Sequence, residues 1–209
     1  MRKRRAPIWR NGRGRLSSLF LLLVPLLACL SGESPFMLLL GASAVVWHEG
    51  GHLFFFLLAG EPPPRLGADA FGLRLRPSLP LSPEKEAFVC LGGPLFNLLA
   101  GGLLLICRGE FFHLYGVLHL LLAFFNLFPV LSTDGGRLLS FLLHRLLPEA
   151  LAASLFRLIS ALLLLFLFFF CAFLFYFGGI GLYGVFFSLF FFWRTVREDF
   201  DNFGDFKRF

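Results

Sequence analysis

The segment FMLLLGASAVVWHEGGHLFFFLLAG, residues 36–60, is the most informative part of the sequence. It is long enough to cross a bilayer, for which about 20 apolar residues suffice. Its centre is interrupted by the pattern H-E-x-x-H, formed by His48, Glu49 and His52. Two histidines four residues apart lie on one face of a helix, where both can bind one metal ion beside the glutamate. Because ionisable groups are costly in hydrocarbon, their presence here indicates a functional site.

The whole chain has the composition of a membrane protein. Of its 209 residues, 57% are hydrophobic, 18% are aromatic and 31 are Phe, which is outside the usual range of soluble domains. We predict an all-α polytopic membrane protein with about six transmembrane helices. It divides into a basic cytoplasmic N-terminal segment (1–15), a six-helix membrane domain (16–193) and a short cytoplasmic tail (194–209). The candidate spans are residues 16–30, 36–60, 87–107, 111–130, 150–177 and 180–193.

The distribution of charge predicts the orientation. The net charge is +6, and seven basic residues precede the first span. Positive charge gathers on the cytoplasmic side of membrane proteins, so we expect the N-terminus inside. Six spans then return the C-terminus to the same side and leave Arg108 as the only basic residue outside. No nucleic-acid partner is expected, because aromatic residues are not interleaved with the basic ones.

Two features leave alternatives open at the ends of the chain. Leu26-Leu27-Ala28-Cys29 resembles a lipoprotein cleavage box, which would make residues 1–28 a signal peptide. The fifth and sixth spans can also be read as one long broken helix, which would move the C-terminus to the other side. The four Cys have no paired C-x-x-C spacing and are interpreted as small buried residues.

The longest predicted loop, residues 61–86, contains an alternating pattern. Three prolines at 62–64 end the preceding helix. Phe71, Leu73 and Leu75 then alternate with Gly or Arg, a period of two that predicts a short membrane-associated β-strand or hairpin. A basic loop without regular structure is the alternative.

A catalytic zinc ion needs a third protein ligand besides the two histidines. Asp134 is the strongest candidate, because Pro129 breaks the fourth span before it and two glycines follow it. The second and fourth spans run in the same direction, so this carboxylate should approach the depth of His52. A turn role for the Asp-Gly pair is the alternative. Other candidate third ligands are His113, His119, His144 and Glu110, although the three histidines are interpreted mainly as residues that hydrogen-bond within the helix bundle.

These motifs together resemble the site-2 proteases, which are intramembrane zinc metalloproteases. HEGGH in one span is followed two spans later by Asn126-x-x-Pro129-x-x-x-x-Asp134-Gly135, and Gly92-Gly93-Pro94-Leu95-Phe96-Asn97 resembles a further signature. The resemblance implies one zinc ion held by His48, His52 and Asp134, with Glu49 as the general base and a site open to the cytosol. Gly50 and Thr133 depart from the residues common in the family, but neither change removes a ligand.

The resemblance also sets expectations about substrate and location. The chain is expected to hydrolyse peptide bonds of a transmembrane or membrane-associated protein in a bacterial cell membrane. An inhibitory membrane partner is also compatible with the resemblance. Its compactness is similar to sporulation proteases that process a pro-sigma factor, and an anti-sigma factor is another candidate substrate. Asn97 and Asn126 are candidates for positioning the substrate, or else polar links between helices. A zinc transporter or metal sensor is the alternative function.

Overall fold

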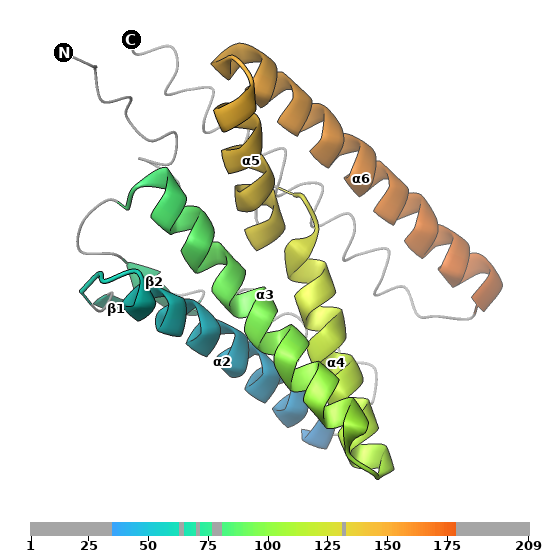
Figure 1. Ribbon diagram of the computed structural model, residues 1–209. Coiled ribbons are helices and arrows are strands. Elements are labelled where there is room, and N and C mark those ends of the chain that lie inside the picture. The colour runs from blue at the N-terminus through green and yellow to red at the C-terminus, as the bar shows by residue number, and fades with distance from the viewer. Residues whose placement is uncertain (1–34, 63–64, 70–71, 77–80, 131–132, 179–209) are drawn as a thin grey trace.

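The computed structural model describes residues 35–62, 65–69, 72–76, 81–130 and 133–178 (Figure 1). The predicted spans at 16–30 and 180–193, the first and last segments of the chain, and Cys29 lie outside this part. Five helices and one hairpin make up the described residues. In chain order they are α2 (Pro35–Leu58), β1 (Arg65–Asp69), β2 (Gly72–Arg76), α3 (Pro83–Ile106), α4 (Glu110–Leu127), α5 (Asp134–Leu146) and α6 (Glu149–Gly178).

Helix α3 is the centre of the arrangement. It packs against α2 on one side and α4 on the other, and α5 contacts its N-terminal half and also packs on α6 (Figure 1). Within the part of the chain that the structure describes, three helices are long and apolar enough to cross a membrane: residues 83–106, 110–127 and 149–170. Helix α2 is also of spanning length, with 24 residues, but it carries the polar H-E-x-x-H pattern and does not meet the same hydropathy criterion.

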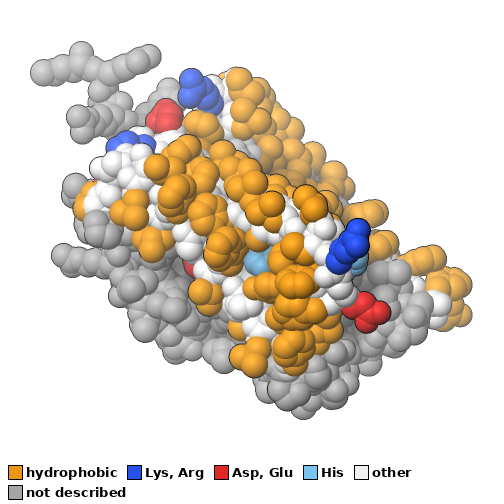
Figure 2. All heavy atoms as spheres, turned by 60° about the horizontal axis from the view of Figure 1, so that its bottom comes forward, with side chains coloured by type: hydrophobic (Ala, Val, Ile, Leu, Met, Phe, Trp, Pro, Cys, Tyr) orange, Lys and Arg blue, Asp and Glu red, His pale blue; other side chains and the backbone are white. Residues whose placement is uncertain are grey.

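The outer surface of these helices is apolar. Side chains such as Leu39, Leu103 and Phe166 are more than 60% exposed. In Figure 2, hydrophobic side chains cover most of the described surface in view, and the charged ones lie toward its margins. Such a surface is unfavourable in water and suited to lipid. The described residues therefore form a helical membrane protein, in agreement with the composition.

Small residues bring the three central helices close together. A Cβ atom on Gly51 of α2 would overlap the carbonyl oxygen of Gly92 in α3, and a Cβ atom on Gly92 would overlap the carbonyl oxygen of Gly51. Gly101 of α3 faces Gly116 of α4 in a similar crossing, where a Cβ on Gly101 would lie 2.9 Å from the Gly116 carbonyl oxygen. Close backbone approach of this kind is a common basis of helix packing in membranes. It brings the His48–His52 face of α2 against α3.

The segment between α2 and α3 contains an antiparallel hairpin. Strands β1 and β2 pair from Arg65↔Arg76 to Asp69↔Gly72. The alternating residues predicted to form a strand overlap β2. An ion pair between Lys85 Nζ and Glu61 Oε1, 2.6 Å apart, joins the end of the α2 region to the first turn of α3.

Two helix boundaries differ from the prediction for clear physical reasons. Helix α3 begins at Pro83, four residues before the predicted span, because Ser82 caps it by accepting a hydrogen bond from Lys85 N. Helix α5 was not predicted as a helix at all. It has only 13 residues, too few to cross a membrane, and its apolar residues follow a helical period on one face only. A search for long apolar runs passes over such a helix.

Candidate metal centre

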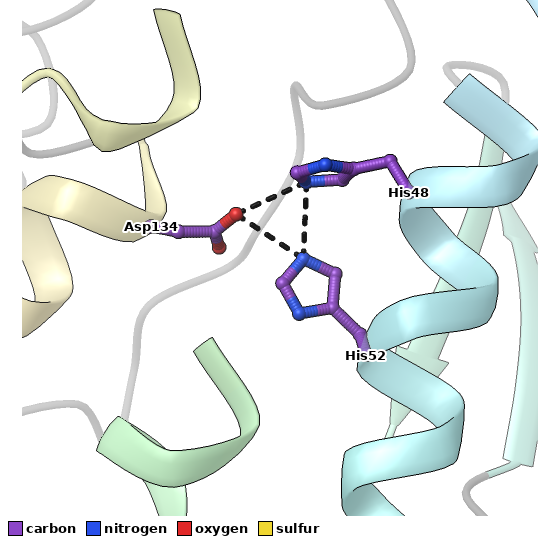
Figure 3. A group of neighbouring side chains, drawn as sticks. All are labelled: His48, His52 and Asp134. Carbon is purple, nitrogen blue, oxygen red and sulfur yellow. Dashed lines mark hydrogen bonds and ion pairs between the residues drawn. The ribbon is translucent and has the colours of Figure 1, made fainter. Parts of the chain in front are cut away.

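The two histidines of the H-E-x-x-H pattern lie one turn apart on α2 and point to the same side (Figure 3). Their ring planes are nearly perpendicular and their Nε2 atoms are 3.2 Å apart. The side chain of His48 is 6% exposed and that of His52 is 12% exposed. Glu49, the next residue after His48, is half-buried. The i, i+4 spacing alone explains why the two rings meet.

Asp134 enters the site from the other side of the fold, at the first residue of α5 (Figure 3). Thr133 caps this helix: its Oγ1 accepts a hydrogen bond from Gly136 N at 3.2 Å and donates to Val130 O at 2.8 Å. Thr133 also contacts Phe128 O, so it ties the α4–α5 connection to the start of α5. This cap directs the Asp134 carboxylate toward the histidines. Thr133 therefore helps to hold the Asp134 carboxylate in place beside the two histidines.

The three side chains form a compact triangle. Asp134 Oδ2 lies 3.1 Å from both His48 Nε2 and His52 Nε2. The Asp134 side chain is 10% exposed, so the triangle is shielded from water on all three sides. Among the described residues this is the one group of three or more potential metal ligands whose atoms converge.

The spacing of the triangle fits zinc. Ligand bonds of about 2.0–2.1 Å in a tetrahedral arrangement separate the ligand atoms by roughly 3.3 Å. The three observed separations, 3.1, 3.1 and 3.2 Å, are close to this value. Two imidazole nitrogens and one carboxylate oxygen are also a common zinc donor set, and three protein ligands leave one coordination position free.

Gly93 leaves space beside the ligand atoms. A Cβ built on this residue of α3 would lie 2.5 Å from Nε2 of both histidines and 2.6 Å from His48 Cε1. Any other residue would therefore push into the region where the two nitrogens converge. The missing side chain of Gly93 is a second observation that fits a bound ion.

The backbone of α3 also fixes the protonation of His52. His52 Nδ1 lies 2.8 Å from Val89 O, and a carbonyl oxygen can only accept a hydrogen bond. The Gly93 N–H group also points toward Nδ1, at 3.3 Å, but the contact with Val89 O is 0.5 Å shorter and favours a proton on Nδ1. The lone pair of Nε2 then points toward His48 and Asp134. A metal-binding histidine usually donates its other N–H in this way.

The remaining candidate ligands lie elsewhere. His113 and Glu110 are exposed on the first turns of α4. His144 interacts within α5, where its Nδ1 lies 2.8 Å from Ser140 O. His119 is 2% exposed and contacts the side chain of Asn97 and not the triangle itself.

The two asparagines that were interpreted together have different surroundings. Asn97 is fully buried, and both ends of its amide contact histidines, His48 and His119. These contacts support the interpretation of a polar link between helices, and positioning of a substrate by Asn97 stays a prediction. Asn126 is half-buried and donates from Nδ2 to Leu122 O at 2.9 Å, one turn earlier in α4. Positioning of a substrate by Asn126 stays a prediction.

No protein-family model matches the chain, and no curated protein matches it either. Among solved structures, the Site-2 Protease from Methanocaldococcus jannaschii is similar to it, with a TM-score of 0.58, 24% sequence identity and 86% of each chain covered. The chain has the site-2 protease fold. This likeness agrees with the resemblance in the motifs, and it extends beyond them to most of the chain.

Sequence reasoning overlooked two contributors to this site, because Gly93 was noted only as part of a signature and Thr133 only as a departure. The interpretation of His119 as a residue that hydrogen-bonds within the bundle is confirmed by its contact with Asn97. The signal for Gly93 was its pairing with Gly92, which predicts close helix packing but not against which atoms. No local pattern could have paired His119 with Asn97, 22 residues away.

Proposed function

We propose that this protein is an intramembrane zinc metalloprotease that hydrolyses peptide bonds of membrane-embedded or membrane-associated proteins. The observation that carries the proposal is the convergence of His48, His52 and Asp134 at zinc-like separations, with Glu49 adjacent, inside a helical membrane protein. A zinc ion held by these residues would act as a Lewis acid, lowering the pKa of water and polarising the scissile carbonyl.

The chain's own residues supply the other parts of the reaction. Glu49 takes a proton from the attacking water and delivers it to the nitrogen of the leaving amine. The substrate has to be locally unwound, because a hydrogen-bonded helix shields its carbonyl groups. The β1–β2 hairpin offers strand edges to which an extended segment can pair, and Asn126 is the candidate for contacting the substrate backbone.

The cytosolic side, the bacterial cell membrane and a pro-sigma or anti-sigma factor as substrate are also proposals. They are supported by the basic N-terminal segment and the motif resemblance. An inhibitory membrane partner would be consistent with the same resemblance. A zinc transporter or sensor would need further exchangeable ligands along a path, and the described residues offer only the one convergent group. Zinc flux in proteoliposomes would favour that rival.

The test is a Glu49→Gln variant. It should retain zinc at wild-type stoichiometry but lose proteolysis, because the amide fills the same space and cannot accept the proton from water. Membrane fractions of cells expressing either form are compared by mass spectrometry for new peptide termini, with Glu110→Gln as a control because this exposed carboxylate lies outside the site. Identical sets of termini for wild type and Glu49→Gln would refute the proposed function.

A further inference from the structure

A buried pair of side chains continues from the candidate metal centre into the space between α3 and α4. His48 Nδ1, the ring nitrogen that faces away from Asp134, lies 3.1 Å from the amide nitrogen of Asn97. Asn97 Oδ1 lies 3.0 Å from His119 Nδ1. Asn97 is 0% exposed and His119 is 2% exposed, so their hydrogen bonds are protected from water. Buried polar groups in this setting have to satisfy one another.

His48 differs from His52 in what holds its outer nitrogen. The partner of His52 Nδ1 is a carbonyl oxygen, which fixes the proton on Nδ1. The partner of His48 Nδ1 is a side-chain amide, which donates through one end and accepts through the other. A half-turn of the amide exchanges these two ends with almost no change in shape. Asn97 alone therefore does not determine which nitrogen of His48 carries the proton.

The orientation of the amide decides whether His48 is able to bind a metal ion. With Nδ2 toward His48, which is the orientation of the contacts given above, the amide donates to Nδ1, and a neutral ring then has its proton on Nε2, the atom that faces Asp134. With Oδ1 toward His48, the ring keeps its proton on Nδ1 and the lone pair of Nε2 is free for the ion. In that orientation the amide NH₂ group faces His119 and needs an acceptor there.

His119 can supply that acceptor, because a neutral imidazole with its proton on Nε2 presents a lone pair at Nδ1. The ring of His119 is also held in place. It packs edge-on against Tyr115, with ring centroids 4.5 Å apart, and the Tyr115 hydroxyl lies 2.8 Å from Ser43 Oγ of α2. His119 is thus fixed between helices at hydrogen-bond distance from the amide.

We propose that Asn97 and His119 are positioning residues: His119 accepts from the Asn97 amide, and the Asn97 oxygen thereby holds His48 with its proton on Nδ1 and its Nε2 free for zinc. This inference rests on the proposed function, since it assumes that His48 is a zinc ligand. It assigns a function to His119, which touches neither the metal position nor Asp134.

The test measures metal binding and not proteolysis. Zinc affinity of the purified full-length protein is determined by competition with a chelator, and the visible absorption spectrum of the Co²⁺-loaded protein reports the ligand geometry. His119→Phe keeps an aromatic ring but removes the acceptor, and we expect about 10–100-fold weaker zinc binding, the usual effect of losing such a partner. His113→Phe on the same helix is exposed and should stay within about twofold of wild type.

A second substitution, Asn97→Asp, distinguishes a role of His119 in orienting the Asn97 side chain from a role in packing. In Asn97→Asp, both ends of the side chain are acceptors, so His119 is no longer needed to orient the oxygen toward His48. His119→Phe should therefore cost less than about threefold in zinc affinity when combined with Asn97→Asp, because the two changes act on one hydrogen-bond network. The Co²⁺ spectrum, altered in His119→Phe alone, should return toward that of wild type in the double variant.

Each failure has a distinct signature. Absence of zinc binding by the wild-type protein would overturn the proposed function itself. If the wild-type protein binds zinc and His119→Phe binds it equally well, only the positioning role is overturned. If His119→Phe loses the same zinc affinity with Asn97 and with Asn97→Asp, His119 has a packing role, and the positioning role is again overturned. Thermal unfolding is followed for every variant, and His119→Leu replaces His119→Phe if the larger ring prevents folding.

Discussion

Replacement of Gly93 by alanine is the sharpest test of whether the triangle holds an ion. The added Cβ would lie 2.5 Å from Nε2 of both His48 and His52, half an ångström inside the 3.0 Å limit that Cβ atoms in proteins respect. One or both rings must move away, or α3 must shift relative to α2. Because the clash involves the two ligand nitrogens themselves, the strain is concentrated on the metal position.

The magnitude follows from the cost of overpacking, about 1–3 kcal/mol for one added carbon in a packed site. If this cost is borne mainly by the liganded state, zinc affinity falls by about 5–150-fold, since each 1.4 kcal/mol is a factor of ten. The intrinsic preference of a helix for alanine over glycine, about 1 kcal/mol, acts in the opposite direction on folding. The variant should therefore remain folded while losing zinc.

The assay is zinc competition with a chelator, combined with thermal unfolding in the same detergent. Gly102→Ala is the matched control, because it lies on the same helix and a Cβ there meets nothing within 4 Å. It should bind zinc as the wild type does. Wild-type zinc affinity in Gly93→Ala would refute the reasoning, because it would mean that the ion does not occupy the space between the two nitrogens.

Three further substitutions test the supports of the site. Gly51→Ala should lower the free energy of unfolding by about 1–3 kcal/mol, measured by thermal or denaturant unfolding, because its Cβ clashes at the α2–α3 crossing. A Cβ on Gly50 meets nothing within 4 Å, so Gly50→Ala should be neutral or slightly stabilising. Equal effects of the two substitutions would contradict the close approach of α2 and α3 at Gly51. Thr133→Val removes the α5 cap and should cost about 0.5–2 kcal/mol of stability, with Thr133→Ser restoring most of it. Lys85→Met breaks the pair with Glu61, and because Lys85 is about half exposed the loss should be below about 1 kcal/mol; a larger loss would show that the pair is a main anchor of α3.

The long helices follow directly from the sequence. The predicted spans 36–60, 87–107, 111–130 and 150–177 correspond to α2, α3, α4 and α6 within a few residues at each end. Apolar runs of this length have few alternatives in a bilayer, since their backbone groups must bond within the segment. Helix α5 was not predicted, because the stability of a short amphipathic helix depends on the neighbouring elements that cover its apolar face.

In the site, too, some features follow from the sequence alone and others only from the tertiary structure. The pairing of His48 with His52 is a local property of helix geometry, so the sequence by itself determined two potential ligands, the adjacent Glu49 and their place within a long, mostly apolar helix. The sequence left five candidates for the third position. Only the tertiary structure brought Asp134 to the histidines, because that contact joins residues 86 positions apart through the packing of α2, α3 and α5.

The tertiary structure also decided what surrounds the ligands. Gly93 faces the two ring nitrogens, Val89 fixes the proton of His52, and Asn97 joins His48 to His119. Each of these contacts depends on the rotation and depth of one helix against another, to within about an ångström. Hydrophobic length and periodicity do not specify such details, because they constrain each helix separately. Side-chain contacts across the glycine crossings do specify them.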